Sequence, residues 1–178
     1  MVDVAAAEDD RTTAQGLFVY ADSYLAAADG LWRQNLAYSH AESPIRFALY
    51  HAAELYLKAF LRATGMTVQQ LRKLEHKFSK LLPAAEARGL NLSAEARHVF
   101  EYGQQSHDII EARYIRNGLR RPIPTVVVAR ATKSVRAAVR EHPARLGHII
   151  LRNERLGEFG AELEAQWQDR GATRERPE

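Results

Sequence analysis

The stretch from Ser43 to Gly65 constrains the fold more than any other part of the chain. Apolar side chains would cover most of the surface of a helix formed over this stretch. They are Ile45, Phe47, Leu49, Ala52, Ala53, Leu55, Tyr56, Leu57, Phe60 and Leu61. Ser43 is a candidate N-cap, Pro44 suits the first helical position, and Gly65 suits the position just past the end. A helix that is apolar nearly all round must be surrounded by other elements, so we predict a central core helix.

Only a narrow polar seam interrupts this apolar surface. His51, Glu54, Lys58 and Arg62 follow one another at spacings of three and four residues, which places them on one side of the helix. The seam has two interpretations. It forms ion pairs within the helix beside a surface histidine, or His51 and Lys58 contact the phosphate of a nucleotide or RNA.

The composition excludes several classes of protein. The 178 residues suit one domain, and without cysteine the chain has no disulfide, no Cys-ligated metal and no cysteine nucleophile. Residues 1–11 are acidic and lack a leader pattern, and no run of 18 apolar residues occurs, so we expect a cytoplasmic protein without a membrane partner. The net charge is +3 and most arginines lie in the last two-thirds, which permits an acidic partner such as RNA.

Helical periodicity continues on both sides of the central stretch. Residues 1–11 form a flexible arm, and Thr12 or Thr13 caps a first helix that reaches about Ala37. After Gly65 we expect a third helix, kinked or interrupted at Pro83 and ended by Gly89.

Two further helices follow within the predicted bundle. Ser93 caps a fourth helix that runs to about Asn117, and Thr125 caps a fifth that runs to about Glu141, before Pro143. No convincing alternation with a period of two occurs. We therefore predict an all-α fold, an up-and-down antiparallel bundle of four to five helices over residues 12–146. An amphipathic helix over 147–169 and a polar tail over 170–178 complete the chain.

Basic and aromatic side chains gather towards the end of the predicted fourth helix. Their types suit phosphate contacts and base stacking, although a solvated helix end would look similar. The cluster comprises Arg113, Tyr114, Arg116, Arg120 and Arg121, and Asn117 beside it is a further candidate contact. His107 and Glu111 share a helix face one turn before Tyr114, where they could orient a base. Two ligands alone do not make a metal site, so we expect neither a metal nor a cofactor.

Three segments in a fixed order resemble the HEPN family, the higher eukaryotes and prokaryotes nucleotide-binding domain. They are HAAELYLKAFLRATG, EHKFSKLL and EARYIRNG, within residues 14–142. The matching residues are Ala53, Glu54, Lys58, Ala59, His76, Arg113 and Tyr114. The resemblance implies a helical bundle that is usually dimeric. It also implies binding of nucleotide or RNA, metal-independent ribonuclease activity in some members, many of them toxins, or partnership with a nucleotidyltransferase.

The ribonuclease branch of that family carries an arginine followed by a histidine after four to six residues. Arg116-Asn117 begins this motif, but Arg121 stands where the histidine would be. The bare spacing occurs at Arg46 with His51 and at Arg136 with His142. In such a pair the histidine acts as acid or base and the arginine holds the phosphate.

Three functions therefore remain open from the sequence. The first is nucleotide or RNA binding by a homodimeric HEPN-like bundle, alone or in a two-component system, with Lys58, Arg113, Tyr114 and Arg116 as the principal contacts. The second is a metal-independent endoribonuclease that uses one of the Arg-His pairs. The third is a non-catalytic bundle that docks on another protein through residues 147–169.

Overall fold

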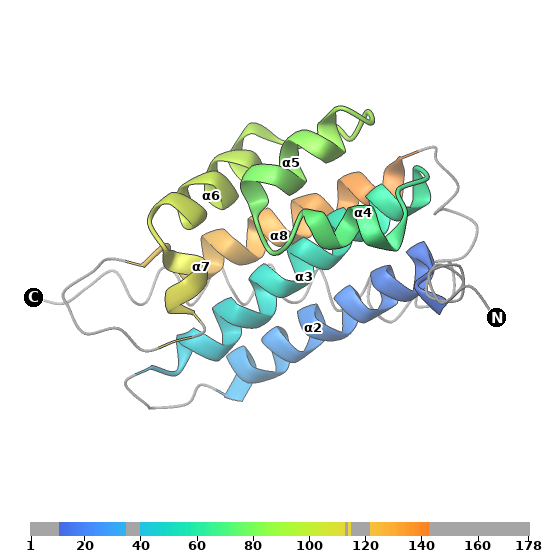
Figure 1. Cartoon of the computed structure of the whole chain (residues 1–178). Helices are drawn as coiled ribbons and strands as arrows, with labels where there is room; N and C mark the ends of the chain where they lie inside the picture. The colour runs from blue at the N-terminus through green and yellow to red at the C-terminus, as the bar shows by residue number, and fades with distance from the viewer. Residues whose placement is uncertain (1–10, 35–39, 113, 115–121, 143–178) are drawn as a thin grey trace, which may run out of the picture.

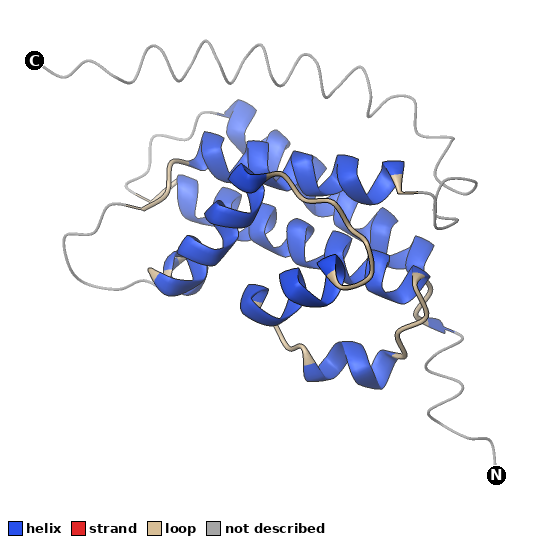
Figure 2. Cartoon of the chain, turned by 90° about the horizontal axis from the view of Figure 1, so that it is seen from above, coloured by secondary structure: helices blue, strands red, loops and turns tan. Residues whose placement is uncertain are grey.

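The fold is organised around the predicted core helix. The computed structural model describes residues 11–34, 40–112, 114 and 122–142. Within these residues the chain forms seven helices and no strand (Figure 2), which confirms the all-α prediction. In chain order they are α2 (Ala14–Gln34), α3 (Glu42–Ala63), α4 (Val68–Lys73), α5 (Phe78–Glu86), α6 (Ala94–Gln105), α7 (Asp108–Glu111) and α8 (Thr125–Glu141). None of the described helices is long and apolar enough to cross a membrane.

Helix α3 lies at the centre of the bundle, as the apolar stretch predicts. It contacts α2 and α8 along its length, and α4, α5 and α7 also pack against it (Figure 1). The largest fully buried side chains include Tyr56 and Phe60 of α3. The rings of Phe78 and Phe100, from α5 and α6, stack with their centroids 4.6 Å apart and close this core.

Side-chain contacts show the relative directions of α2 and α3. Arg62 near the end of α3 donates to the carbonyl of Thr12, just before α2, whereas His51 earlier in α3 meets Tyr24 further along α2. Helices α2 and α3 are therefore antiparallel.

Helix α8 runs in the same direction as α3, against which it packs. The Thr125 hydroxyl donates to Glu42 over 2.6 Å, and the Thr132 hydroxyl donates to the carbonyl of Leu49 over 3.2 Å. Both contacts join residues 83 apart. The expectation of antiparallel neighbours thus holds for α2 and α3 but not for this central pair.

Helix starts agree only in part with the prediction. The Thr13 hydroxyl accepts a hydrogen bond from the amide of Gly16, and Ser93 accepts one from the amide of Ala96, so both predicted caps are present. The predicted cap at Ser43 is wrong, because α3 already begins at Glu42. The cap at Thr125 is also wrong, since its buried hydroxyl instead binds Glu42.

The predicted third helix is two separate helices. The chain leaves the helical path between α4 and α5, where Glu75 has a positive φ of 57°, and not at Pro83. Pro83 lies inside α5, which continues past it to Glu86. Gly65 and Gly89, the predicted stops, adopt φ values of 94° and 90° that suit glycine.

The predicted fourth helix is also interrupted. Helix α6 ends at Gln105, and His107 adopts a left-handed conformation with a φ of 64° before the short α7 begins at Asp108. The break turns the chain so that α7 packs back on α3. The predicted helix over 147–169, the polar tail over 170–178 and residues 1–10 of the predicted N-terminal arm lie outside the described residues.

Candidate functional site

Glu54 is the centre of the polar seam on α3. Its side chain is only 3% exposed, yet three other polar side chains approach it. The Lys58 ammonium lies 2.7 Å from Oε1, and Nδ1 of His51 lies 3.8 Å from Oε2. Nδ1 of His76, in the link between α4 and α5, lies 2.8 Å and 3.0 Å from the two carboxylate oxygens. The seam therefore extends beyond its own helix.

These neighbours keep Glu54 ionised. Burial by itself raises the pKa of a carboxyl group, but the contacts of Glu54 with His51, Lys58 and His76 outweigh it. Together they lower the pKa of Glu54 to about 2. An ionised carboxylate only accepts hydrogen bonds, so the Nδ1 of His76 must carry the proton in this contact.

A pocket of about 680 Å³ opens above this cluster. Its walls come from the start of α3, from the link between α4 and α5, and from the segment that follows α7. The lining residues are His40, Ser43, Pro44, Phe47, His51, His76, Ala112 and Tyr114. The pocket volume lies within the usual range of about 300–1,000 Å³ for small-molecule sites.

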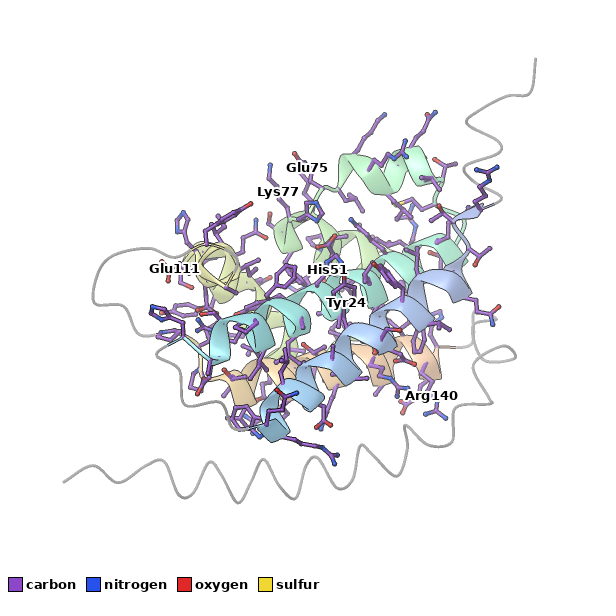
Figure 3. The ribbon with its side chains drawn as sticks, turned by 90° about the horizontal axis from the view of Figure 1, so that it is seen from below. Tyr24, His51, Glu75, Lys77, Glu111 and Arg140 are labelled. Carbon is purple, nitrogen blue, oxygen red and sulfur yellow. The ribbon has the colours of Figure 1, made fainter. Side chains whose placement is uncertain are left out.

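His51 belongs both to the polar seam and to the lining of the pocket. Its ring is 4.4 Å from that of Tyr24, edge to face, and lies parallel to Phe47 at 5.9 Å. In Figure 3 the labelled His51 and Tyr24 lie together between α3 and α2, and Glu75 and Lys77 lie on the neighbouring link. The Nδ1 atom of His51 is buried and forms no hydrogen bond.

Arg46, the predicted partner of His51, points to a different centre. Its guanidinium lies 3.1 Å from Asp108 at the start of α7, and the Tyr50 hydroxyl donates to the same carboxylate over 2.5 Å. Arg46, Tyr50 and Asp108 are all buried. Burial and the adjacent negative charge of Asp108 raise the pKa of Tyr50. Arg46 thus holds α7 against α3.

Arg136, in the second predicted pair, also has a buried partner. Its Nε donates to Asp22 of α2 over 2.7 Å, and the Tyr56 hydroxyl donates to the same carboxylate over 2.5 Å. Burial opposes the charge of Arg136, but the contact with Asp22 outweighs it and raises the pKa of Arg136. The predicted partner, His142, instead packs edge to face on Phe60, 4.8 Å between ring centres.

The other predicted contacts are only partly described. Lys58 pairs with Glu54, Tyr114 lines the pocket and is 67% exposed, and His107 is exposed at the break before α7. Arg113, Arg116, Asn117, Arg120 and Arg121 lie outside the described residues. The structure thus brings His51 and Tyr114 to one pocket, whereas Lys58 is paired with Glu54 and does not line that pocket.

His76 is the main pocket residue that sequence reasoning did not propose as a contact. It lies 22 residues from Glu54, and no local spacing joins the two. The resemblance to the HEPN family was the available signal, since it marked both residues. Asp22 and Asp108 were missed for the same reason, because their partners come from distant helices.

The site offers no ready metal centre. Among the described residues, no group of three or more histidine, aspartate or glutamate side chains is arranged to hold a metal ion. Comparison of the chain with family models, curated proteins and solved structures finds no match.

Proposed function

We propose that the protein is a HEPN-like helical module that binds a nucleotide or RNA in the pocket above Glu54. The observation that carries this proposal is the joint placement of His51, His76, Phe47 and Tyr114 around one cavity. Aromatic side chains stack on bases, and a protonated imidazole donates hydrogen bonds to phosphate. The resemblance in sequence to HEPN proteins supports the same reading.

Ligand-induced stabilisation tests this proposal. A ligand that binds only the folded chain raises its melting temperature, so at least one of the ribonucleotides or a short single-stranded RNA should do so. Tyr114→Ala should reduce this rise, because it removes a stacking surface at the pocket. Tyr102→Ala is the matched control, since Tyr102 is also an exposed tyrosine, at 49%, but does not line the pocket. An equal loss in both variants would contradict the assignment of the pocket.

A metal-independent endoribonuclease is the second candidate function. The observation that favours it is that two imidazoles, His51 and His76, line one pocket and could share the roles of acid and base. Arg46 and Arg136 are held by buried carboxylates, so His51 is the member of the predicted pairs placed in a cavity. RNA cleavage in EDTA that His51→Ala abolishes and His142→Ala preserves would support this function.

We also propose, from the resemblance alone, a homodimer that acts beside a nucleotidyltransferase in a two-component system. A nucleotidyltransferase encoded next to this chain, and co-purification of the two proteins, would support the partnership. Sedimentation of the purified chain as a monomer would contradict the dimer.

A further inference from the structure

The Glu54 cluster indicates which part of a ligand the pocket recognises. We propose that the pocket binds a terminal phosphate, a phosphate monoester such as that of a nucleoside 5′-monophosphate, through Nε2 of His76 braced by Glu54. This inference rests on the proposed nucleotide-binding function. It adds the group that is recognised and the atom that recognises it.

Glu54 determines which nitrogen of His76 faces the ligand. Both carboxylate oxygens lie within 3.0 Å of Nδ1, and the carboxylate is buried and ionised. The Nδ1 proton is therefore committed to Glu54, which leaves Nε2 as the free nitrogen. The His76 side chain is 60% exposed and lines the pocket, so a ligand can reach this atom.

The charges around His76 favour an anion. None of the described residues that line the pocket is acidic, and three are histidines. The charge of Glu54 is offset by Lys58 at 2.7 Å. Glu75, the neighbour of His76 in the chain, is paired with Lys77 at 2.7 Å and Lys80 at 2.8 Å. No uncompensated carboxylate among these groups would repel a phosphate.

The backbone is strained in the link that carries His76 and in the link before α7. Among the described non-glycine residues, only Glu75 and His107 have a positive φ. Glu75 directly precedes His76, and His107 directly precedes α7, which leads to Ala112 and Tyr114 in the pocket. Such conformations cost about 1–3 kcal/mol and concentrate at functional sites. The two strained positions thus lie next to His76 and before the short helix that leads to Ala112 and Tyr114.

Proton chemistry favours a monoester over a diester. A monoester has a second pKa near 6, so it either brings a proton to Nε2 or accepts one from the imidazolium. A diester has no proton to share in this range and carries only one negative charge. A hydrogen bond between Nε2 and the phosphate therefore forms in more protonation states with a monoester. We infer that the pocket discriminates between the two.

Calorimetric titration of the full chain tests the inference. The probes are the four nucleoside 5′-monophosphates, the matching nucleosides, and the matching 5′-methyl phosphate diesters. At least one monophosphate should bind about tenfold or more tightly than its nucleoside and its diester, the size of one charge-assisted hydrogen bond.

Two asparagine variants isolate the role of His76. His76→Asn retains an amide donor near the position of Nδ1, so the contact with Glu54 can persist, but it removes Nε2. Binding of the monophosphate should fall about tenfold, to the level of the diester. His98→Asn is the control, because His98 is exposed on α6 and stacks on Tyr102, away from the pocket lining. It should bind as the wild type does.

The outcomes separate this inference from the proposed function. Equal binding of monophosphate and diester by the wild type, or an undiminished preference in His76→Asn, would overturn the inference and leave nucleotide binding standing. Binding of a labelled single-stranded RNA without binding of any monophosphate would do the same. If neither monophosphates nor RNA bind, both proposals fail.

Discussion

Two buried carboxylates, Glu54 on α3 and Asp108 at the start of α7, differ in the accessibility of their partners. Asp108 and Glu54 are each no more than 3% exposed, and each has a cationic partner and a second polar contact. The partners of Asp108 are the buried Arg46 and Tyr50, so this centre is closed. Glu54 instead binds His76, whose side chain is 60% exposed at a pocket.

This difference distinguishes a carboxylate with a structural role from a carboxylate at a candidate binding site. A carboxylate with only buried partners stabilises one arrangement of helices and has no atom left for a ligand. A carboxylate that orients a solvent-accessible imidazole leaves a nitrogen free to bind one. Burial of a charge is therefore weak evidence of function on its own, and the exposure of its partners decides between the two cases.

The largest expected effect on stability follows from the removal of Asp108, the carboxylate of the closed centre. Asp108→Ala leaves the Arg46 guanidinium buried without its partner, so we expect the free energy of unfolding to fall by about 3–5 kcal/mol. Urea denaturation at neutral pH measures it. Glu95→Ala is the control, because its ion pair with Arg130 is about half exposed and should contribute at most about 1 kcal/mol. Equal losses in the two variants would show that Asp108 contributes no more to the free energy of unfolding than an exposed ion pair does.

The contribution of Glu54 to the stability of the folded chain should depend on pH. The pKa of Glu54 lies at about 2 in the folded chain, below its ordinary value of 4.5. The stabilisation of the folded chain by ionised Glu54 is therefore complete above pH 4.5 and is lost as the pH falls towards 2. Glu54→Gln should be less stable than the wild type by about 3 kcal/mol near neutrality, at about 1.4 kcal/mol for each pH unit between the two values. This difference should shrink in acid.

A variant that changes no titrating group controls the pH series. Gly30→Ala adds a methyl group where no atom lies within 4 Å, so its difference from the wild type should stay constant across the same pH range. Urea denaturation at several pH values measures both differences. A constant difference for Glu54→Gln would mean that Glu54 is not held ionised by its neighbours.

The sequence predicted the scaffold of both centres better than the centres themselves. The apolar surface from Ile45 to Leu61 was sufficient to place α3 in the core, because only a surrounded helix can bury such a surface. Local chemistry was also reliable where one residue type decides the conformation, as for the Ser93 cap and the positive φ of Gly65.

The breaks in the helices and the side-chain partners from distant helices could not be predicted from local sequence. Glu75 and His107 adopt positive φ values without the glycine that normally marks such a position, so two predicted helices continued through them. The partners of Asp22, Asp108 and Glu54 are set by packing of distant helices, which leaves no spacing in the sequence. The pocket depends on both features, and of its lining residues only His51 and Tyr114 had been named as candidate site residues.

The smallest expected effect comes from a methyl group added beside the Asp108 centre. A Cβ atom at Gly103 would lie 3.0 Å from the Tyr50 hydroxyl, which is itself bonded to Asp108. Gly103→Ala should therefore destabilise the chain by about 1–2 kcal/mol, because the crowding outweighs the usual gain of about 1 kcal/mol for alanine in a helix. Gly30→Ala meets no atom within 4 Å and should show that gain alone. Thermal denaturation compares the two. A stabilising Gly103→Ala would mean that Tyr50 can move, and that the Asp108 centre is less tightly closed than the comparison with Glu54 requires.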